Sequence, residues 1–151
     1  MAFNAGSQPS SRRLRKSSPA NVTSWDVRRR DFDYDFCRRM LKIRRMVTSF
    51  YYTDFYPLTS YRTENDVWMA WQFHDPQAQA GLFHAFRRPQ SPASSLQFHL
   101  RGIQAGKRYQ FSNLIDETSF ILDGKDILVN GLPVTLNQRR SASLLLYKLV
   151  P

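Results

Sequence analysis

The side chains in this sequence best suited to acid–base chemistry are its carboxylates. Glycoside hydrolysis needs two carboxyl groups that face one substrate. From residue 51 onward, nearly every carboxylate falls in or beside an expected turn, and turn formation explains these positions without catalysis: Glu64, Asp66, Asp75, Asp116, Glu117, Asp123 and Asp126. Asp54 differs because it lies within a run of aromatic residues. We expect Asp54 to be a polar anchor, either buried or directed at a neighbouring domain.

The three histidines and the single cysteine form no metal-binding or nucleophile motif. His74, His84 and His99 fall on or beside three different expected strands. Zinc sites usually show short ligand spacings such as HxxxH or CxxC, and neither occurs. Cys37 has no flanking histidine, no GxSxG turn is present, and no glycine-rich loop opens a helix. The sequence therefore predicts no catalytic residue, no metal site and no cofactor.

A cluster of aromatic residues is the best candidate for ligand binding. The run from Tyr51 to Tyr56 surrounds Asp54 with aromatic rings, and two tryptophans follow it closely. Exposed rings can stack on sugars or bases, whereas buried rings pack a core or dock a domain. We expect sugar or domain-docking contacts from five residues: Tyr52, Asp54, Tyr56, Trp68 and Trp71.

The net charge of +10 is concentrated in the first third of the chain. Residues 1–50 hold 12 Lys and Arg against 4 Asp and Glu, whereas residues 51–151 hold 10 against 8. A nucleic-acid interface should combine a basic surface with interleaved exposed aromatics, which the basic part lacks, so we expect no nucleic acid. The chain contains no apolar run of about 18 residues and no secretory signal, so we expect a cytoplasmic protein without membrane contact.

The elements that must position these residues begin with one helix. Residues 1–24 are rich in Ser, Pro and Arg and predict a disordered basic leader. An amphipathic helix is expected from Asp31, with apolar residues at steps of three and four: Phe36, Met40, Ile43, Val47 and Phe50. We expect Asp31 to be its N-cap and Asp35 to pair with Arg38 or Arg39. Lys and Arg in its later turns suit the helix dipole.

After Phe50 the hydrophobic pattern becomes that of strands. Eight strands are expected, at 54–58, 67–74, 81–87, 96–101, 108–114, 120–122, 133–136 and 142–149. Their short connections favour antiparallel pairing, with a single helical turn within 123–130. The fold class is therefore mainly β: an antiparallel β-sandwich of seven or eight strands over residues 51–151, preceded by the helical segment 25–50 and the leader 1–24.

In the second strand, alternation places Val67, Met69, Trp71 and Phe73 on one face and Trp68, Ala70, Gln72 and His74 on the other. Both sets contain large apolar residues, so we expect both faces of this strand to be at least partly covered.

Three runs of sequence resemble bacterial α-galactosidases of glycoside hydrolase family 36. They are Tyr51 to Thr59 (YYTDFYPLT), Val67 to Phe73 (VWMAWQF) and Ala85 to Arg88 (AFRR). In that family a (β/α)8 barrel is followed by a C-terminal antiparallel β-domain, and these runs look like its junction and first strands. The segment from Trp25 to Phe50 looks like the last piece of the barrel. The resemblance extends from about Trp25 to Leu149.

The resemblance implies a retaining glycosidase whose two catalytic aspartates lie on barrel strands. No position here matches either motif, and seven of the eight barrel strands have no place in the leader, so we expect the chain alone to be inactive. It also implies that the apolar face of the helix, which the family would bury against a barrel, is left uncovered. Our leading hypothesis is a non-catalytic accessory domain that packs against and stabilises a glycosidase barrel. The alternatives are a carbohydrate-binding module that takes galactosides and, ranked last, a basic nucleic-acid-binding protein.

Overall fold

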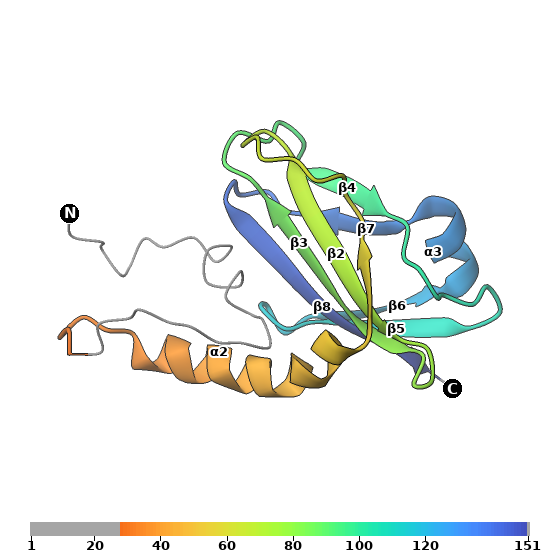
Figure 1. The fold of residues 1–151 in the computed structure, drawn as a ribbon, viewed down its shortest axis with the longest axis horizontal. Helices are drawn as coiled ribbons and strands as arrows, with labels where there is room; N and C mark the ends of the chain where they lie inside the picture. Colours follow the sequence, from red (N-terminus) through yellow and green to blue (C-terminus); the bar gives the residue numbers. More distant parts are fainter. Residues whose placement is uncertain (1–27, 151) are drawn as a thin grey trace.

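The computed structural model describes residues 28–150, in which two α-helices, one 3-10 helix and eight strands occur (Figure 1). The leader 1–24 and the start of the expected helical segment, Trp25 to Val27, lie outside the described residues. The helices are α2 (Tyr34–Val47), η2 (Thr48–Tyr52) and α3 (Gly124–Asn130). The strands are β1 (Asp54–Pro57), β2 (Trp68–Asp75), β3 (Ala80–Arg87), β4 (Ser95–Phe98), β5 (Arg108–Asn113), β6 (Ser119–Asp123), β7 (Leu132–Thr135) and β8 (Ser141–Val150).

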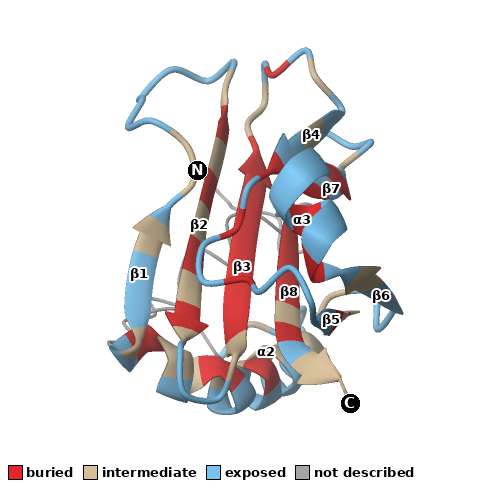
Figure 2. Cartoon of the chain, turned by 90° about the vertical axis from the view of Figure 1, so that its right-hand side faces the viewer, coloured by how far each residue is buried: buried red, intermediate tan, exposed pale blue. Residues whose placement is uncertain are grey.

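The strands form two antiparallel sheets, which confirms the expected fold class. The large sheet has the order β1-β2-β3-β8-β5-β6, and β4 pairs with β7 in the small sheet. The C-terminal strand β8 thus lies between β3 and β5 at the centre of the large sheet. Figure 2 shows that buried residues follow β2, β3 and β8, whereas the edge strands β1 and β6 are mostly exposed.

The fourth expected strand is shorter than predicted. Strand β4 ends at Phe98, whereas the sequence pattern continues to Arg101. The backbone of Arg101 bonds instead to the buried side chain of Gln72: its N–H donates to Gln72 Oε1 at 2.8 Å and its carbonyl accepts from Gln72 Nε2 at 2.8 Å. A polar side chain of β2 therefore replaces a neighbouring strand as the partner of this segment.

The large sheet separates two hydrophobic clusters. One face of β2 directs Trp68 and Ala70 toward the small sheet and α3, into a cluster that includes Phe83, Phe111 and Tyr147. The other face packs Met69, Trp71 and Phe73 against a cluster on the α2 side. The two sets of alternating residues predicted for this strand are confirmed, since α2 and the small sheet lie on opposite sides (Figure 1).

Helix α2 begins two residues later than its expected cap. The N-cap is Asp33, whose Oδ1 accepts a hydrogen bond from the Phe36 N–H at 2.8 Å. The prediction of Asp31 was wrong because the Asp31 carboxylate pairs with the guanidinium of Arg29 outside the helix. The predicted pair between Asp35 and Arg38 is confirmed, at 2.7 Å, although both side chains are largely exposed.

Replacing the observed cap should weaken α2. We expect Asp33→Ala to lower the free energy of unfolding by about 1 kcal/mol, because the Phe36 N–H loses its acceptor. The matched control is Asp31→Ala, which removes only an exposed ion pair and should leave the unfolding curve close to that of the wild type. Urea unfolding followed by circular dichroism measures both. An equal loss in the two variants would contradict the assignment of the cap.

The apolar face of α2 is covered by the chain's own sheet. Ile43 and Val47 are buried in one cluster with Leu82, Phe86 and Leu144 of β3 and β8. The expectation of an uncovered apolar face was therefore wrong, because the sheet supplies the apolar surface that the sequence argument assigned to a barrel. Within residues 28–150, no helix has the length and apolar composition needed to cross a membrane.

The segment between β6 and β7 is longer than the single turn expected. Helix α3 has seven residues and ends at Gly131, whose φ of 79° suits glycine. Ile127 of α3 is fully buried in the cluster between the sheets. The helix therefore completes the cover over one face of the large sheet next to the two short strands of the small one.

Candidate functional site

Two of the five predicted contact residues lie together on the edge strand β1. Asp54 pairs in register with His74, and Tyr56 with Gln72. The Tyr56 hydroxyl donates a long hydrogen bond of 3.3 Å to Asp54 Oδ2. Asp54 is exposed and Tyr56 is half-buried, so this edge presents a carboxylate and a phenol on the side of the sheet that faces β4 and β7.

The other three predicted residues are separated from that pair. Tyr52 ends η2 and is 77% exposed. Trp68 is 5% exposed, lies in the core between the sheets and donates from Nε1 to the Ala93 carbonyl at 3.0 Å. Trp71 is half-buried on the opposite face, where its ring stacks on His84 at a centroid distance of 5.2 Å. The structure does not bring the five residues into one platform.

A buried polar cluster, which we define as Gln72, His74 and Tyr147, lies next to the β1 pair. Gln72 Nε2 donates to the Tyr147 Oη at 2.6 Å, and the Tyr147 Oη lies 2.9 Å from His74 Nδ1. The Tyr147 hydroxyl thus joins Gln72 to His74, whose other ring nitrogen, Nε2, has no hydrogen-bond partner among the described residues. All three side chains are at least 99% buried.

The pKa values in this cluster follow from its burial. Desolvation raises the pKa of the Tyr147 hydroxyl and lowers the pKa of His74, although the nearby carboxylates of Asp54 and Asp75 oppose the second shift. The cluster is therefore uncharged near neutral pH. It offers hydrogen bonds that order the core and no charged pair for acid–base work.

Two glycines make room for the cluster. Gly81 of β3 lies opposite Tyr147 in register, and a Cβ there would overlap the Tyr147 hydroxyl and the carbonyl of Phe73. Gly102 has a φ of 73° and lies against the His74 imidazole, where a Cβ would overlap the ring. Both positions therefore require glycine for lack of space, and Gly102 also for its backbone conformation.

Sequence reasoning missed this cluster, although one signal was present. The polar Gln72 and His74 alternate with apolar residues in a strand expected to be covered on both faces. Their partners could not be identified, because Arg101 and Tyr147 are 29 and 75 residues away from Gln72. Only the order of the strands brings them together.

A second buried histidine lies on the α2 side of the sheet. His84 is fully buried, and the rings of Tyr51, Trp71, Phe73 and Phe86 surround it at centroid distances of 5.2 to 6.5 Å. Neither of its ring nitrogens has a hydrogen-bond partner among the described residues. Burial lowers the pKa of His84 to about 3, so this imidazole is neutral and is held by packing alone.

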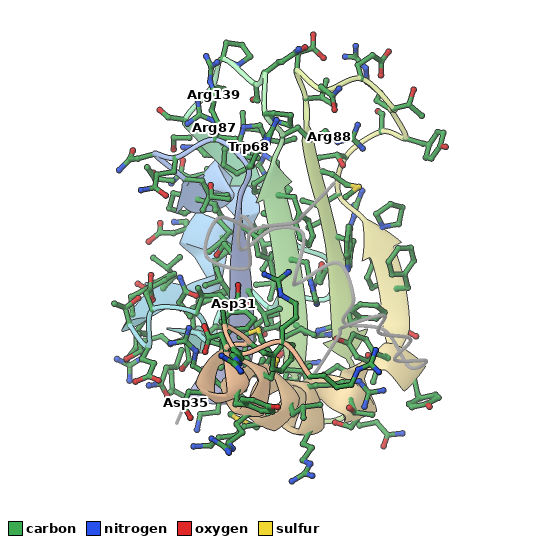
Figure 3. The ribbon with its side chains drawn as sticks, turned by 90° about the vertical axis from the view of Figure 1, so that its left-hand side faces the viewer. Asp31, Asp35, Trp68, Arg87, Arg88 and Arg139 are labelled. Carbon is green, nitrogen blue, oxygen red and sulfur yellow. The ribbon has the colours of Figure 1, made fainter. Side chains whose placement is uncertain are left out.

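A buried arginine joins two loops at the end of the sheet away from Asp31 and Asp35 (Figure 3). The Arg87 guanidinium donates to the carbonyls of Leu136 and Asn137 at 2.7 and 2.9 Å, and to those of Ser91 and Pro92 at 3.0 and 3.4 Å. Arg87 is 5% exposed. It therefore fixes the loop after β3 against the loop after β7, which accounts for the arginine in this part of the resemblance.

Replacing the Arg87 guanidinium by a smaller donor group should destabilise the domain. We expect Arg87→Lys to lower the free energy of unfolding by about 2 kcal/mol, because an ammonium group cannot reach both loops as the planar guanidinium does. Arg139→Lys, at an exposed position in the neighbouring loop, should be neutral within about 0.5 kcal/mol. Chemical unfolding of both variants checks this, and an unchanged Arg87→Lys protein would show that the four hydrogen bonds contribute little.

The histidines do not converge. His74 and His84 lie on opposite faces of the large sheet, and His99 is exposed beyond β4. Between residues 28 and 150, no group of three or more His, Cys, Asp or Glu side chains is arranged to hold a metal ion.

The fold defines a class of domain: a two-sheet antiparallel β-domain with a helix packed across one face. Solved structures similar to this chain include α-galactosidases. The α-galactosidase of Lactobacillus brevis matches 83% of this chain with a TM-score of 0.64 and 13% identity, over 18% of its own chain. Forms of the glycoside hydrolase family 36 α-galactosidase AgaA of Geobacillus stearothermophilus, in complex with raffinose and with stachyose, match the same share with TM-scores of 0.66 and 0.64 and identities of 15% and 19%.

The structural match confirms the resemblance predicted from the sequence, at the level of the fold. This chain spans about one sixth of each enzyme, since the matched region is 17–18% of their length. A match of this extent is consistent with a C-terminal domain. No protein-family model matches the sequence, and no curated protein matches it.

Proposed function

We propose that this chain is a non-catalytic accessory β-domain that packs against a glycosidase barrel and stabilises it. The observation that carries the proposal is the match of 83% of this chain to only 17–18% of α-galactosidases. The region matched in those enzymes is one part of a much larger chain, and its counterpart here suits the same accessory role.

The chemistry of the described residues supports this role. Two buried polar side chains of the domain, Gln72 and Arg87, bond to the chain's own backbone, and Gln72 also bonds to Tyr147. The buried titratable groups at the site, His74, His84 and Tyr147, are shifted toward their neutral forms by burial. These residues build a rigid domain and leave no poised acid or base.

A co-expression experiment tests the proposal. The test barrel is AgaA without the part of its chain that the fold match covers. We expect the test barrel to be more soluble, and its α-galactosidase activity to last at least about tenfold longer at elevated temperature, when this chain is present, because binding stabilises the folded state. Full-length AgaA is the control and should gain nothing. If the test barrel gains neither solubility nor lifetime, the proposal fails.

The exposed aromatics beside Asp54 favour a second candidate function, the binding of galactosides. Tyr52 and Phe55 are 77% and 55% exposed and lie close to the exposed Asp54 in the sequence, although Asp54 and Phe55 face opposite sides of β1. A raffinose titration followed by intrinsic fluorescence tests this candidate, with Tyr52→Ala expected to abolish the change. A flat titration for the wild-type chain would eliminate it. The cytoplasmic location stays a prediction.

A further inference from the structure

We infer that the outward side of α2 is the docking surface of this domain and that its occupant is an acidic, partly apolar patch on the barrel. This inference rests on the proposed function and adds the surface and the chemistry of the contact. We call this surface the basic face and define it by the exposed residues of α2, which include four cations and one carboxylate: Tyr34, Asp35, Arg38, Arg39, Leu41, Lys42, Arg45 and Met46.

The centre of the basic face points away from the domain. Ile43 and Val47 turn the opposite side of α2 onto the sheet. With 3.6 residues per turn, Tyr34, Leu41 and Arg45 lie about 160° or more from Ile43 around the helix axis. Arg39 and Met46 lie only about 40° and 60° from Ile43 and form one edge of the face. Nitrogen-tipped side chains extend from α2 away from the sheet in Figure 3.

The charge of this face is not balanced within the domain. Arg38 pairs with Asp35, and this pair is exposed, with side-chain exposures of 74% and 93%. Among the described residues, no carboxylate pairs with Arg39, Lys42 or Arg45. A partner surface rich in Asp and Glu would complement this charge and would speed association by electrostatic steering.

Exposed apolar side chains between these cations favour a protein partner. Tyr34, Leu41 and Met46 are 51%, 44% and 48% exposed. A phosphate backbone would contact the cations and leave these three groups in water. A bilayer would require one continuous apolar stripe, but the continuous stripe of α2 is already packed on the sheet. An acidic protein surface with shallow apolar pockets would pair with the cations of the basic face and also bury its exposed apolar side chains.

Exposed apolar residues on β6 and α3 provide the control. Phe120 and Ile121 on the edge strand β6, together with Leu128 and Val129 on α3, are 37% to 66% exposed. This area adjoins Asp116, Glu117 and Asp126 rather than a row of cations. Its substitution changes exposed hydrophobicity without touching the basic face.

The experiment measures the binding of the full chain to the test barrel. Arg38→Gln, Lys42→Gln and Arg45→Gln together should weaken binding at least tenfold and remove most of its salt dependence, and Leu41→Gln alone should weaken it at least threefold. Glutamine keeps the helix propensity of these positions. The paired control Ile121→Ser and Val129→Ser should bind like the wild type, and circular dichroism must show all variants folded.

The outcomes separate the inference from the proposed function. If the wild-type chain binds and the triple glutamine variant binds equally well, the docking surface is elsewhere and the inference is overturned while the accessory role stands. If the wild-type chain does not bind the test barrel, the accessory role itself fails. If single-stranded RNA or phosphatidylglycerol vesicles bind the basic face more tightly than the test barrel does, the partner class is overturned.

Discussion

Gly81→Ala is expected to destabilise the domain by at least about 3 kcal/mol, because the new methyl group has no space. A Cβ at this position overlaps both the Tyr147 hydroxyl and the Phe73 carbonyl. The Tyr147 side chain is fully buried and bonded to Gln72 and His74, and the carbonyl belongs to the neighbouring strand β2. Neither neighbour can move without breaking the buried polar cluster or the pairing of β2 with β3. Urea unfolding followed by circular dichroism measures the loss.

Gly106 supplies the control, and a double variant tests how much of the loss comes from the overlap with the Tyr147 hydroxyl. No atom lies within 4 Å of a Cβ built on Gly106, so Gly106→Ala should be neutral or slightly stabilising. Adding Tyr147→Phe to Gly81→Ala removes the overlap with the hydroxyl but leaves the overlaps with the ring carbon Cζ and with the Phe73 carbonyl, so at most a small partial recovery is expected. A Gly81→Ala protein within 1 kcal/mol of the wild type would contradict the close packing of β3 against β2 and β8.

The second large effect is a dependence of stability on pH that originates at His84. Its pKa is lowered from 6.5 to about 3 by burial. Below pH 6.5, His84 is therefore protonated in the unfolded chain but not in the folded chain. The free energy of unfolding is highest above this pH and decreases as the pH falls toward 3. Between pH 6.5 and 3, each pH unit lowers the free energy of unfolding by about 1.4 kcal/mol. Two units below 6.5, at pH 4.5, His84 should cost the wild type about 3 kcal/mol relative to pH 7.

His84→Leu should remove this loss, since leucine fills a comparable space among the aromatic rings and does not titrate. The free energy of unfolding is measured at several pH values for both proteins, and the difference between them should grow as the pH falls below 6.5. The carboxylates and His74 contribute to both curves and cancel in this difference. A constant difference between His84→Leu and wild type would show that His84 is accessible to protons.

The sequence pattern predicted the strands and their faces well, because alternation is a local property. In β2 the two sets of residues that it separates line the two clusters of the folded domain. The pattern also located α2, since one stripe of apolar residues at helical spacing is buried as Ile43 and Val47. It erred by two residues at the cap, where Asp31 and Asp33 are equally good candidates by type and only the pair with Arg29 decides between them.

The remaining features depend on contacts between distant parts of the chain. The position of β8 between β3 and β5 decides which residue lies opposite Gly81, and the sequence did not indicate this order. The depth of Trp68 depends on the small sheet that covers it, so its type alone suggested a binding platform as readily as a core residue. The same long-range contacts turn the apolar side of α2 inward and leave its cations outside.

Our proposal is that this domain acts by association with a glycosidase barrel. Sedimentation velocity of the purified full chain mixed with the test barrel measures that association directly. We expect one faster boundary with the mass of a one-to-one complex at low salt, and a weaker complex as the salt concentration rises. Two independent boundaries at every salt concentration would contradict it.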